Sequence, residues 1–337
     1  MTELYSYKSS PDIRKEIFES DFSDTLNLSG GLPEKLKRSS KLFTIKYPSP
    51  FITSVEENDT VYSELFINSI KSSGLIILLH GFSSSPTKLA NYYRFIDAAL
   101  ENGFSCAFLN MPYHLNRTPA NEKSGERLIY FDDVQTLKFY HQAVVDIRRL
   151  TDILKENFNF KKIFLCGFSM GSMLSIITTA IDNRIDKAAL IFGGGNWFEI
   201  HWNSMLAYVL RGNCIRDGII TKDKCREIYT AFPSFLKEFK SADISSIGLE
   251  HCDSISLRDK IVKKCFLCDP LAFAHRLDRH KVIMLGSRLD HFFSKKSLLQ
   301  VWEEAGRPEL HWFFELHTSF ILNNKHARKL IFGFYQR

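Results

Sequence analysis

The chain of 337 residues has no long apolar run, and this absence limits the classes of protein to which it can belong. No stretch approaches the roughly 18 apolar residues of a membrane helix, so we expect no integral membrane segment. The first residues, MTELYSYKSS, have no apolar core like that of a secretory signal peptide. No internal repeat or low-complexity segment is visible. These absences predict a soluble cytoplasmic protein.

A strong excess of one charge sign is also missing. The net charge of +6 comes from 44 basic and 38 acidic residues that are scattered along the chain. Without a basic stripe or a recognisable nucleic-acid module, we expect no nucleic-acid partner. With 45% hydrophobic residues the chain can bury a substantial core, so gross disorder is excluded.

The chain has seven cysteines, an odd number that cannot be completely paired in disulfides. Cys265 and Cys268 have the spacing of a metal-binding pair, but a second pair that would complete four zinc ligands is missing. We therefore predict free thiols that pack in the interior, no metal and no cofactor.

The remaining sequence alternates short apolar runs with amphipathic segments. Such alternation predicts right-handed crossovers and a mostly parallel central sheet flanked by helices, an α/β fold. Residues 1–40 are polar and irregular, and we expect a leader segment there, followed by a domain over 41–337 that opens with an antiparallel edge pair. The expected strands lie at 41–47, 61–67, 75–79, 104–109, 163–166, 188–192, 281–285 and 310–315, and the clearest helices follow Ser85-Pro86 and span 133–157.

The alternation pauses between about residues 197 and 280. This stretch is helical in character and rich in aromatic residues, and it contains no clear core strand. An insertion of this length between two sheet strands predicts a helical cap over the carboxyl edge of the sheet, where open α/β sheets bind their ligands.

The most informative motif is Gly167-Phe-Ser169-Met-Gly171, which follows an apolar run and precedes a helix-compatible segment. Strand, Gly-x-Ser-x-Gly and helix in that order are typical of a nucleophile elbow, in which the serine hydroxyl is exposed at a sharp turn. A serine needs a base to take its proton, and that base needs an acid to orient it. Asp290 and His317 each follow a predicted strand, in the chain order Ser, Asp, His, so we predict a Ser169–His317–Asp290 triad.

Two backbone N–H groups are expected to stabilise an oxyanion at this serine. One is that of Met170, directly after the nucleophile, and the other is that of Phe82, in the loop His80-Gly81-Phe82 after an early strand. We expect His80 to be structural. His311 and His326 are weaker candidates for the base, since the first lies inside a strand and the second in a later basic helix.

These motifs resemble the α/β-hydrolase superfamily over about residues 40 to 337. Met111-Pro-Tyr-His114-Leu-Asn-Arg117-Thr-Pro119, followed by Ser124-Gly-Glu126, is similar to a subgroup of largely uncharacterised bacterial abhydrolases. One departure is Glu315-Leu316 before His317, where the family often has two glycines. The resemblance implies an α/β-hydrolase fold and a serine hydrolase.

His114 and Arg117 lie in the loop after a core strand, a position suited to substrate contact, or they pair with Glu126 or Asp132 to hold the loop. The sequence as a whole predicts hydrolysis of a small-molecule carboxylic ester through an acyl-enzyme. The alternatives are a thioesterase, peptidase or acyltransferase with the same triad, or a catalytically silent binding protein. Acyl chain length, leaving group and oligomeric state do not follow from the sequence.

Overall fold

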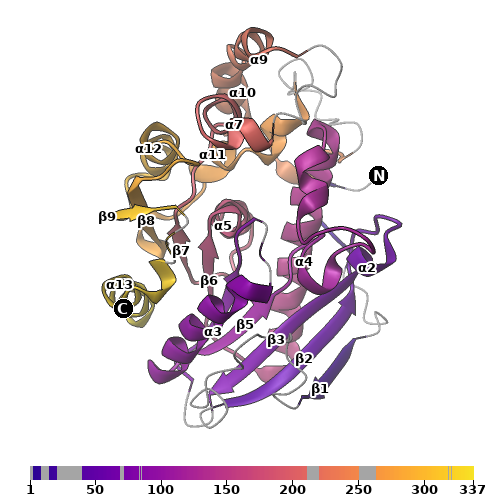
Figure 1. Cartoon of the computed structure of the whole chain (residues 1–337), viewed down its shortest axis with the longest axis vertical. Helices are drawn as coiled ribbons and strands as arrows, with labels where there is room; N and C mark the ends of the chain where they lie inside the picture. The colour runs from indigo at the N-terminus through magenta and orange to yellow at the C-terminus, as the bar shows by residue number, and fades with distance from the viewer. Residues whose placement is uncertain are drawn as a thin grey trace.

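A single twisted sheet runs through the computed structural model, which describes residues 3–8, 15–20, 40–68, 72–82, 84, 86–210, 220–249, 263–317, 319 and 321–337 (Figure 1). Within these residues the sheet has nine strands in the order β1-β2-β3-β5-β4-β6-β7-β8-β9. The strands are β1 (Glu16–Glu19), β2 (Ser40–Pro48), β3 (Thr60–Asn68), β4 (Leu75–Leu79), β5 (Ser105–Leu109), β6 (Ile163–Phe168), β7 (Lys187–Ile191), β8 (Val282–Leu289) and β9 (Glu309–Leu316).

In this order the six strands β5, β4, β6, β7, β8 and β9 are parallel to one another. Each of β1, β2 and β3 pairs antiparallel with the next strand of the sheet. The predicted antiparallel pair is therefore confirmed, but β1 lies outside it and forms the edge. The central strand β4 is Leu-Ile-Ile-Leu-Leu, and all five residues are buried. A strand without polar alternation can be covered on both faces, and this one is.

Helices cover both faces of the sheet and bury a separate core on each. Leu75, Ile77 and Leu79 of β4 point to one core, and Ile76 and Leu78 point to the other. This split follows from the two-residue period of a strand. The first core includes residues of α4 (Asp133–Phe158), α5 (Met170–Ile181), α11 (Pro270–Ala274) and α12 (Lys295–Glu304), and the second includes residues of α3 (Pro86–Glu101) and α13 (Lys325–Gln336). The short α2 (Glu56–Asp59) precedes β3.

The described parts of the segment between β7 and β8, where the sequence predicts a helical cap, contain helices and no strand of the sheet. Its helices α7, α9 and α10 lie at the top of Figure 1, above the sheet. Phe232, Phe235 and Phe239 stack in a row, and the first two also pack on Phe266, so the aromatic residues of this stretch pack on one another. The cap bounds of about 197–280 stay a prediction. The helices are α6 (Trp197–Trp202), α7 (Leu206–Val209), α9 (Lys222–Tyr229), α10 (Phe232–Phe239) and α11.

The described part of the predicted leader packs on the domain. Leu4 and Tyr5 are buried, the Tyr5 N–H donates to His141 Nδ1 over 2.9 Å, and the Tyr5 hydroxyl donates to the Leu267 carbonyl over 2.9 Å. His141 is accordingly a packed core residue of α4. The division at residue 40 stays a prediction, and Ser85, the expected N-cap of α3, lies outside the described residues.

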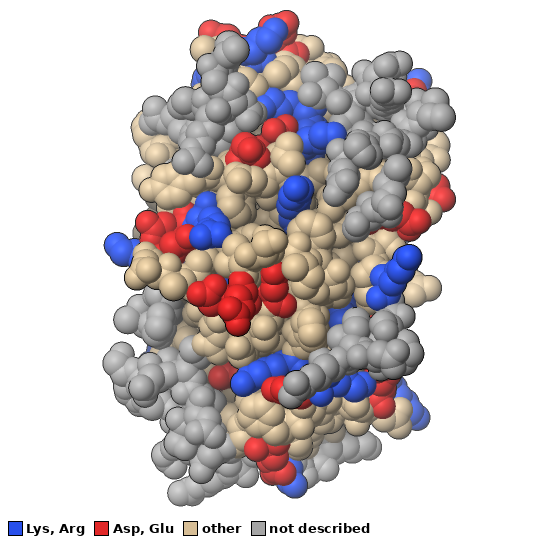
Figure 2. Space-filling view, turned by 90° about the vertical axis from the view of Figure 1, so that its right-hand side faces the viewer, with Lys and Arg blue, Asp and Glu red and all other residues tan. Residues whose placement is uncertain are grey.

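The surface carries both charge signs. Figure 2 shows Lys and Arg interspersed with Asp and Glu on the face that it presents, which fits the scattered charges of the sequence. In the part of the chain that the structure describes, none of the helices combines the length and apolar character that membrane crossing requires.

Candidate active site

Ser169 occupies a strained turn between β6 and α5. Its φ is +57° and its ψ is −116°, a backbone conformation that costs a non-glycine residue of order 1–3 kcal/mol. The turn closes only because its flanking residues have no Cβ. A Cβ on Gly167 would overlap the Gly171 carbonyl, and one on Gly171 would overlap the Leu79 carbonyl. The motif thus has the strand, turn and helix that its sequence predicts.

The structure brings the three predicted triad residues together at the carboxyl edge of the sheet. His317 directly follows β9, and Asp290 directly follows the neighbouring parallel strand β8. His317 Nε2 lies 2.9 Å from Ser169 Oγ, and His317 Nδ1 lies 2.8 Å from Asp290 Oδ2. The second oxygen, Asp290 Oδ1, accepts the backbone N–H groups of Phe292 and Phe293, each over 2.8 Å. The carboxylate is therefore held at both oxygens.

Aromatic rings surround the His317 imidazole, a feature that the sequence does not predict. The ring centroids of Phe168, Phe292 and Phe293 lie 5.5, 4.9 and 5.5 Å from that of His317. The two weaker candidates for the base, His311 and His326, have other partners. His311 Nε2 lies 2.8 Å from Glu309 Oε1, and His326 packs on Phe313.

The loop after β4 lies against the serine. Gly81 is so close that a Cβ there would stand 3.3 Å from Ser169 Cβ. Its N–H donates to the Tyr92 hydroxyl over 2.9 Å, and its carbonyl accepts Ser84 Oγ over 2.9 Å. His80 adds a third link, because its Nδ1 lies 2.9 Å from the Gly81 carbonyl and its Nε2 accepts the Met111 N–H over 3.1 Å.

These contacts give His80 the structural role that we expect for it. The carbonyl requires a proton on Nδ1, and the Met111 N–H requires a bare Nε2, so the two bonds together select one neutral tautomer. Burial lowers the pKa of His80 to about 4, which agrees with a neutral ring. Tyr92 and Ser84 hold the same loop, and the sequence does not predict this role. The pattern around Tyr92 indicates only that it lies in an amphipathic helix.

A cavity of about 440 Å³ opens beside Ser169 and His317. Phe82 and Met170, the predicted oxyanion residues, both line it. Its other lining residues are mostly apolar and come from both the body and the cap. They are Gly81, Ser84, Lys88, Asn91, Tyr92, Leu128, Phe131, Thr136, Phe139, Tyr140, Phe168, Met173, Trp197, Ile200, His201, Leu206, Leu210, Phe292 and Phe293.

Arg117 and His114 are not among the residues that line this cavity, which contradicts the predicted substrate contact. Arg117 is completely buried, pairs with Asp146 over 2.8 Å and donates to the carbonyls of Asn58 and Asn110. Arg117 pairs with Asp146 of α4 and not with the alternative partners Glu126 and Asp132. A guanidinium satisfied in this way fixes the loop and has no exposed edge for a substrate.

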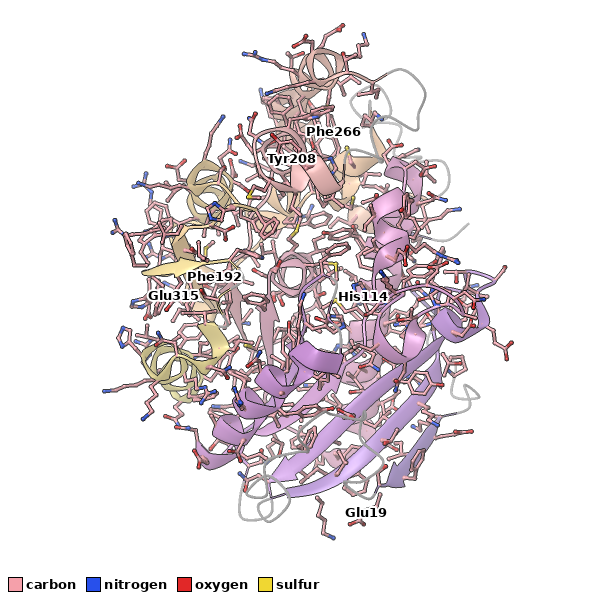
Figure 3. The ribbon with its side chains drawn as sticks, in the orientation of Figure 1. Glu19, His114, Phe192, Tyr208, Phe266 and Glu315 are labelled. Carbon is pink, nitrogen blue, oxygen red and sulfur yellow. The ribbon has the colours of Figure 1, made fainter. Side chains whose placement is uncertain are left out.

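The His114 ring, labelled in Figure 3, packs edge to face against the Phe82 ring with 6.1 Å between the ring centroids. Its Nδ1 lies 2.8 Å from the Pro112 carbonyl, and a Cβ on Gly125 would overlap its ring. Burial, with His80 nearby, lowers the pKa of His114 to about 3, so the ring is neutral. His114 therefore supports the Gly81 loop through its contact with the Phe82 ring.

Comparisons with known proteins agree with this architecture. A family model described as the alpha/beta hydrolase fold matches residues 74–212. The Pyrococcus furiosus esterase Pf2001 superposes with a TM-score of 0.52 at 14% identity, covering 91% of this chain and 96% of its own. Acetyl xylan esterase 1 from Thermoanaerobacterium gives 0.55 at 12% identity, with 96% and 88% covered.

A third similar structure is a cold-adapted esterase from an Arctic intertidal metagenomic library. It has a TM-score of 0.50 at 15% identity, and 90% of this chain and 97% of that one are covered. A sequence search of the curated proteins finds no match. At these identities the likeness concerns the fold, and the fold, the matched segment and the strand–turn–helix around Ser169 agree. The chain therefore has the alpha/beta hydrolase fold.

Proposed function

We propose that this protein is a serine hydrolase that cleaves small-molecule carboxylic esters through an acyl-enzyme. The observation that carries the proposal is the hydrogen-bonded chain from Asp290 Oδ2 through His317 to Ser169 Oγ, with contacts of 2.8 and 2.9 Å, at the wall of a cavity. Such an arrangement provides a nucleophile, a base and an orienting acid in sequence. The esterase neighbours support ester hydrolysis as the reaction class.

In the proposed reaction Ser169 Oγ attacks the ester carbonyl while His317 Nε2 accepts the hydroxyl proton. The Asp290 carboxylate stabilises the imidazolium that forms and keeps its Nδ1–H directed away from the serine. The bond from carbonyl carbon to the leaving oxygen then breaks, and His317 returns its proton to that oxygen. A water molecule attacks the acyl-enzyme by the same route and releases the acid.

The charge of the tetrahedral intermediate falls on the former carbonyl oxygen. We assign its two donors to the backbone N–H groups of Met170 and Phe82. Met170 is the first residue of α5, where backbone N–H groups have no partner within the helix and the helix dipole is positive. Phe82 follows Gly81, whose backbone packs against Ser169.

A fluorophosphonate probe tests the proposal, because it reacts with an activated serine and not with an ordinary one. Mass spectrometry of the labelled protein should locate the adduct on Ser169. Ser169→Ala and His317→Ala should each lower hydrolysis of a p-nitrophenyl ester on the order of 10⁴-fold or more while the circular dichroism spectrum stays that of the folded protein. Absence of labelling in folded protein would favour a catalytically silent binding protein instead.

A further inference from the structure

The cavity beside Ser169 has an inner part lined by buried side chains and an outer part bounded by more exposed ones. Its inner part lies between α4, α5 and α6, where Tyr140, Met173 and Ile200 are each at most 3% exposed. Its outer part is bounded by Lys88 on α3, which is exposed, and by Leu206, which is partly exposed. Ser169 also lines the cavity, so a substrate bound there can extend inward on one side and toward solvent on the other.

The inner part, which we call the acyl arm, is mostly apolar. It is lined by Leu128, Phe131, Thr136, Phe139, Tyr140, Met173, Trp197, Ile200 and His201. Its polar side chains are uncharged near pH 7. The Tyr140 hydroxyl contacts Met173 Sδ over 3.4 Å, and burial lowers the pKa of His201 to about 4, so that its ring is neutral at pH 7.

Such a surface cannot solvate a charged or strongly polar acyl group, since burying one without partners is costly. Among the described residues that line the cavity, there is no carboxylate to pair with an ammonium group. The ammonium of an amino-acyl group therefore finds no counter-charge in the acyl arm. A hydrocarbon chain, by contrast, is stabilised by each methylene that it buries.

The volume of the cavity limits the length of the acyl chain that it can hold. A methylene occupies roughly the 30 Å³ that a water molecule takes in the liquid, so the 440 Å³ of the whole cavity correspond to about fifteen such groups. We propose that the leaving group lies in the outer part and that the acyl arm binds a hydrocarbon acyl chain of about eight to twelve carbons. This inference rests on the proposed ester hydrolysis and names its substrate class.

The test is a series of p-nitrophenyl esters from acetate to palmitate with the full-length protein. Each buried methylene should raise kcat/KM up to about fourfold, so octanoate should exceed butyrate by at least tenfold and palmitate should fall below the optimum. A preference for acetate or butyrate would overturn the inference. In that event Ser169 would still be labelled by the fluorophosphonate, whereas a failure of the proposed function would remove both the labelling and all ester hydrolysis.

Ile200→Phe places an aromatic ring in the acyl arm and should lower the ratio of kcat/KM for decanoate to kcat/KM for butyrate at least tenfold. The matched control is Met205→Phe, which adds a similar ring to an exposed cap position outside the cavity and should leave the profile unchanged. Ile200→Ala enlarges the arm and should move the optimum toward longer chains, which keeps the test valid if the phenylalanine variant does not fold. Equal profiles for all three variants and the unchanged protein would refute the assignment.

Discussion

Tyr92→Phe tests whether the loop that carries Phe82 acts in catalysis. The Tyr92 hydroxyl accepts the Gly81 N–H over 2.9 Å, and burial raises the pKa of Tyr92 to about 12, so the hydroxyl is neutral at any assay pH near 7. Its ring packs on Phe108 with 5.3 Å between centroids. Phenylalanine keeps the ring and removes the hydroxyl, which accepts this buried N–H and also interacts with the Ser84 side chain.

The size of the effect follows from two costs. A buried N–H that loses its acceptor costs about 1–3 kcal/mol of folding free energy. The loop can lower this cost by shifting Gly81, but the shift carries the Phe82 N–H away from the position of the oxyanion. Full loss of one oxyanion donor lowers kcat by about 10²–10³-fold. A partial displacement should therefore lower kcat by about 10- to 100-fold, with KM changed less than about threefold.

Tyr93→Phe is the matched control, because it removes a hydroxyl from the next residue of the same helix. The Tyr93 hydroxyl donates to Glu64 Oε2 over 2.5 Å and lies outside the cavity, so its loss should cost about 1.5–3 kcal/mol of stability with kcat unchanged. Steady-state kinetics with p-nitrophenyl octanoate and urea unfolding of both variants provide the comparison. If Tyr92→Phe stays within twofold of the unchanged kcat, or if Tyr93→Phe lowers kcat as much, the positioning role of Tyr92 is wrong.

Two further variants test the buried charges. Asp146→Asn leaves the Arg117 guanidinium buried without a counter-charge and should cost about 3–5 kcal/mol in urea unfolding, whereas Glu227→Gln, at the exposed pair with Lys224, should cost less than about 1 kcal/mol. A large rise in KM for folded Asp146→Asn would instead favour a substrate role for Arg117. Burial raises the pKa of Asp269 to about 6, so the folded state holds this proton more tightly than the unfolded chain does, and stability from this group falls as pH rises from about 4 to 6. Asp269→Asn should remove about 3 kcal/mol of pH dependence in that window, and parallel stability curves would contradict the assignment.

The Arg117 result shows why some residue roles do not follow from motif position. The loop after β5 is a suitable place for substrate contact, and nothing in its sequence distinguishes an arginine that faces the cavity from one that turns inward. Its partner Asp146 lies 29 residues away on α4, among apolar neighbours. Only the packing of that helix against the loop brings the two charges together in the interior.

The sequence by itself determines the parts of this protein that depend on consecutive residues. Apolar runs without polar alternation specify the buried parallel strands, glycines on both sides of Ser169 permit the elbow, and strand ends place Asp290 and His317 at one edge because parallel strands end there together. The tertiary structure alone decides the rest: the aromatic rings around His317, the hold of Tyr92 on Gly81 and the size of the acyl arm. These features are made by side chains from separate elements, and their distances depend on how helices and cap pack, which local sequence patterns do not record.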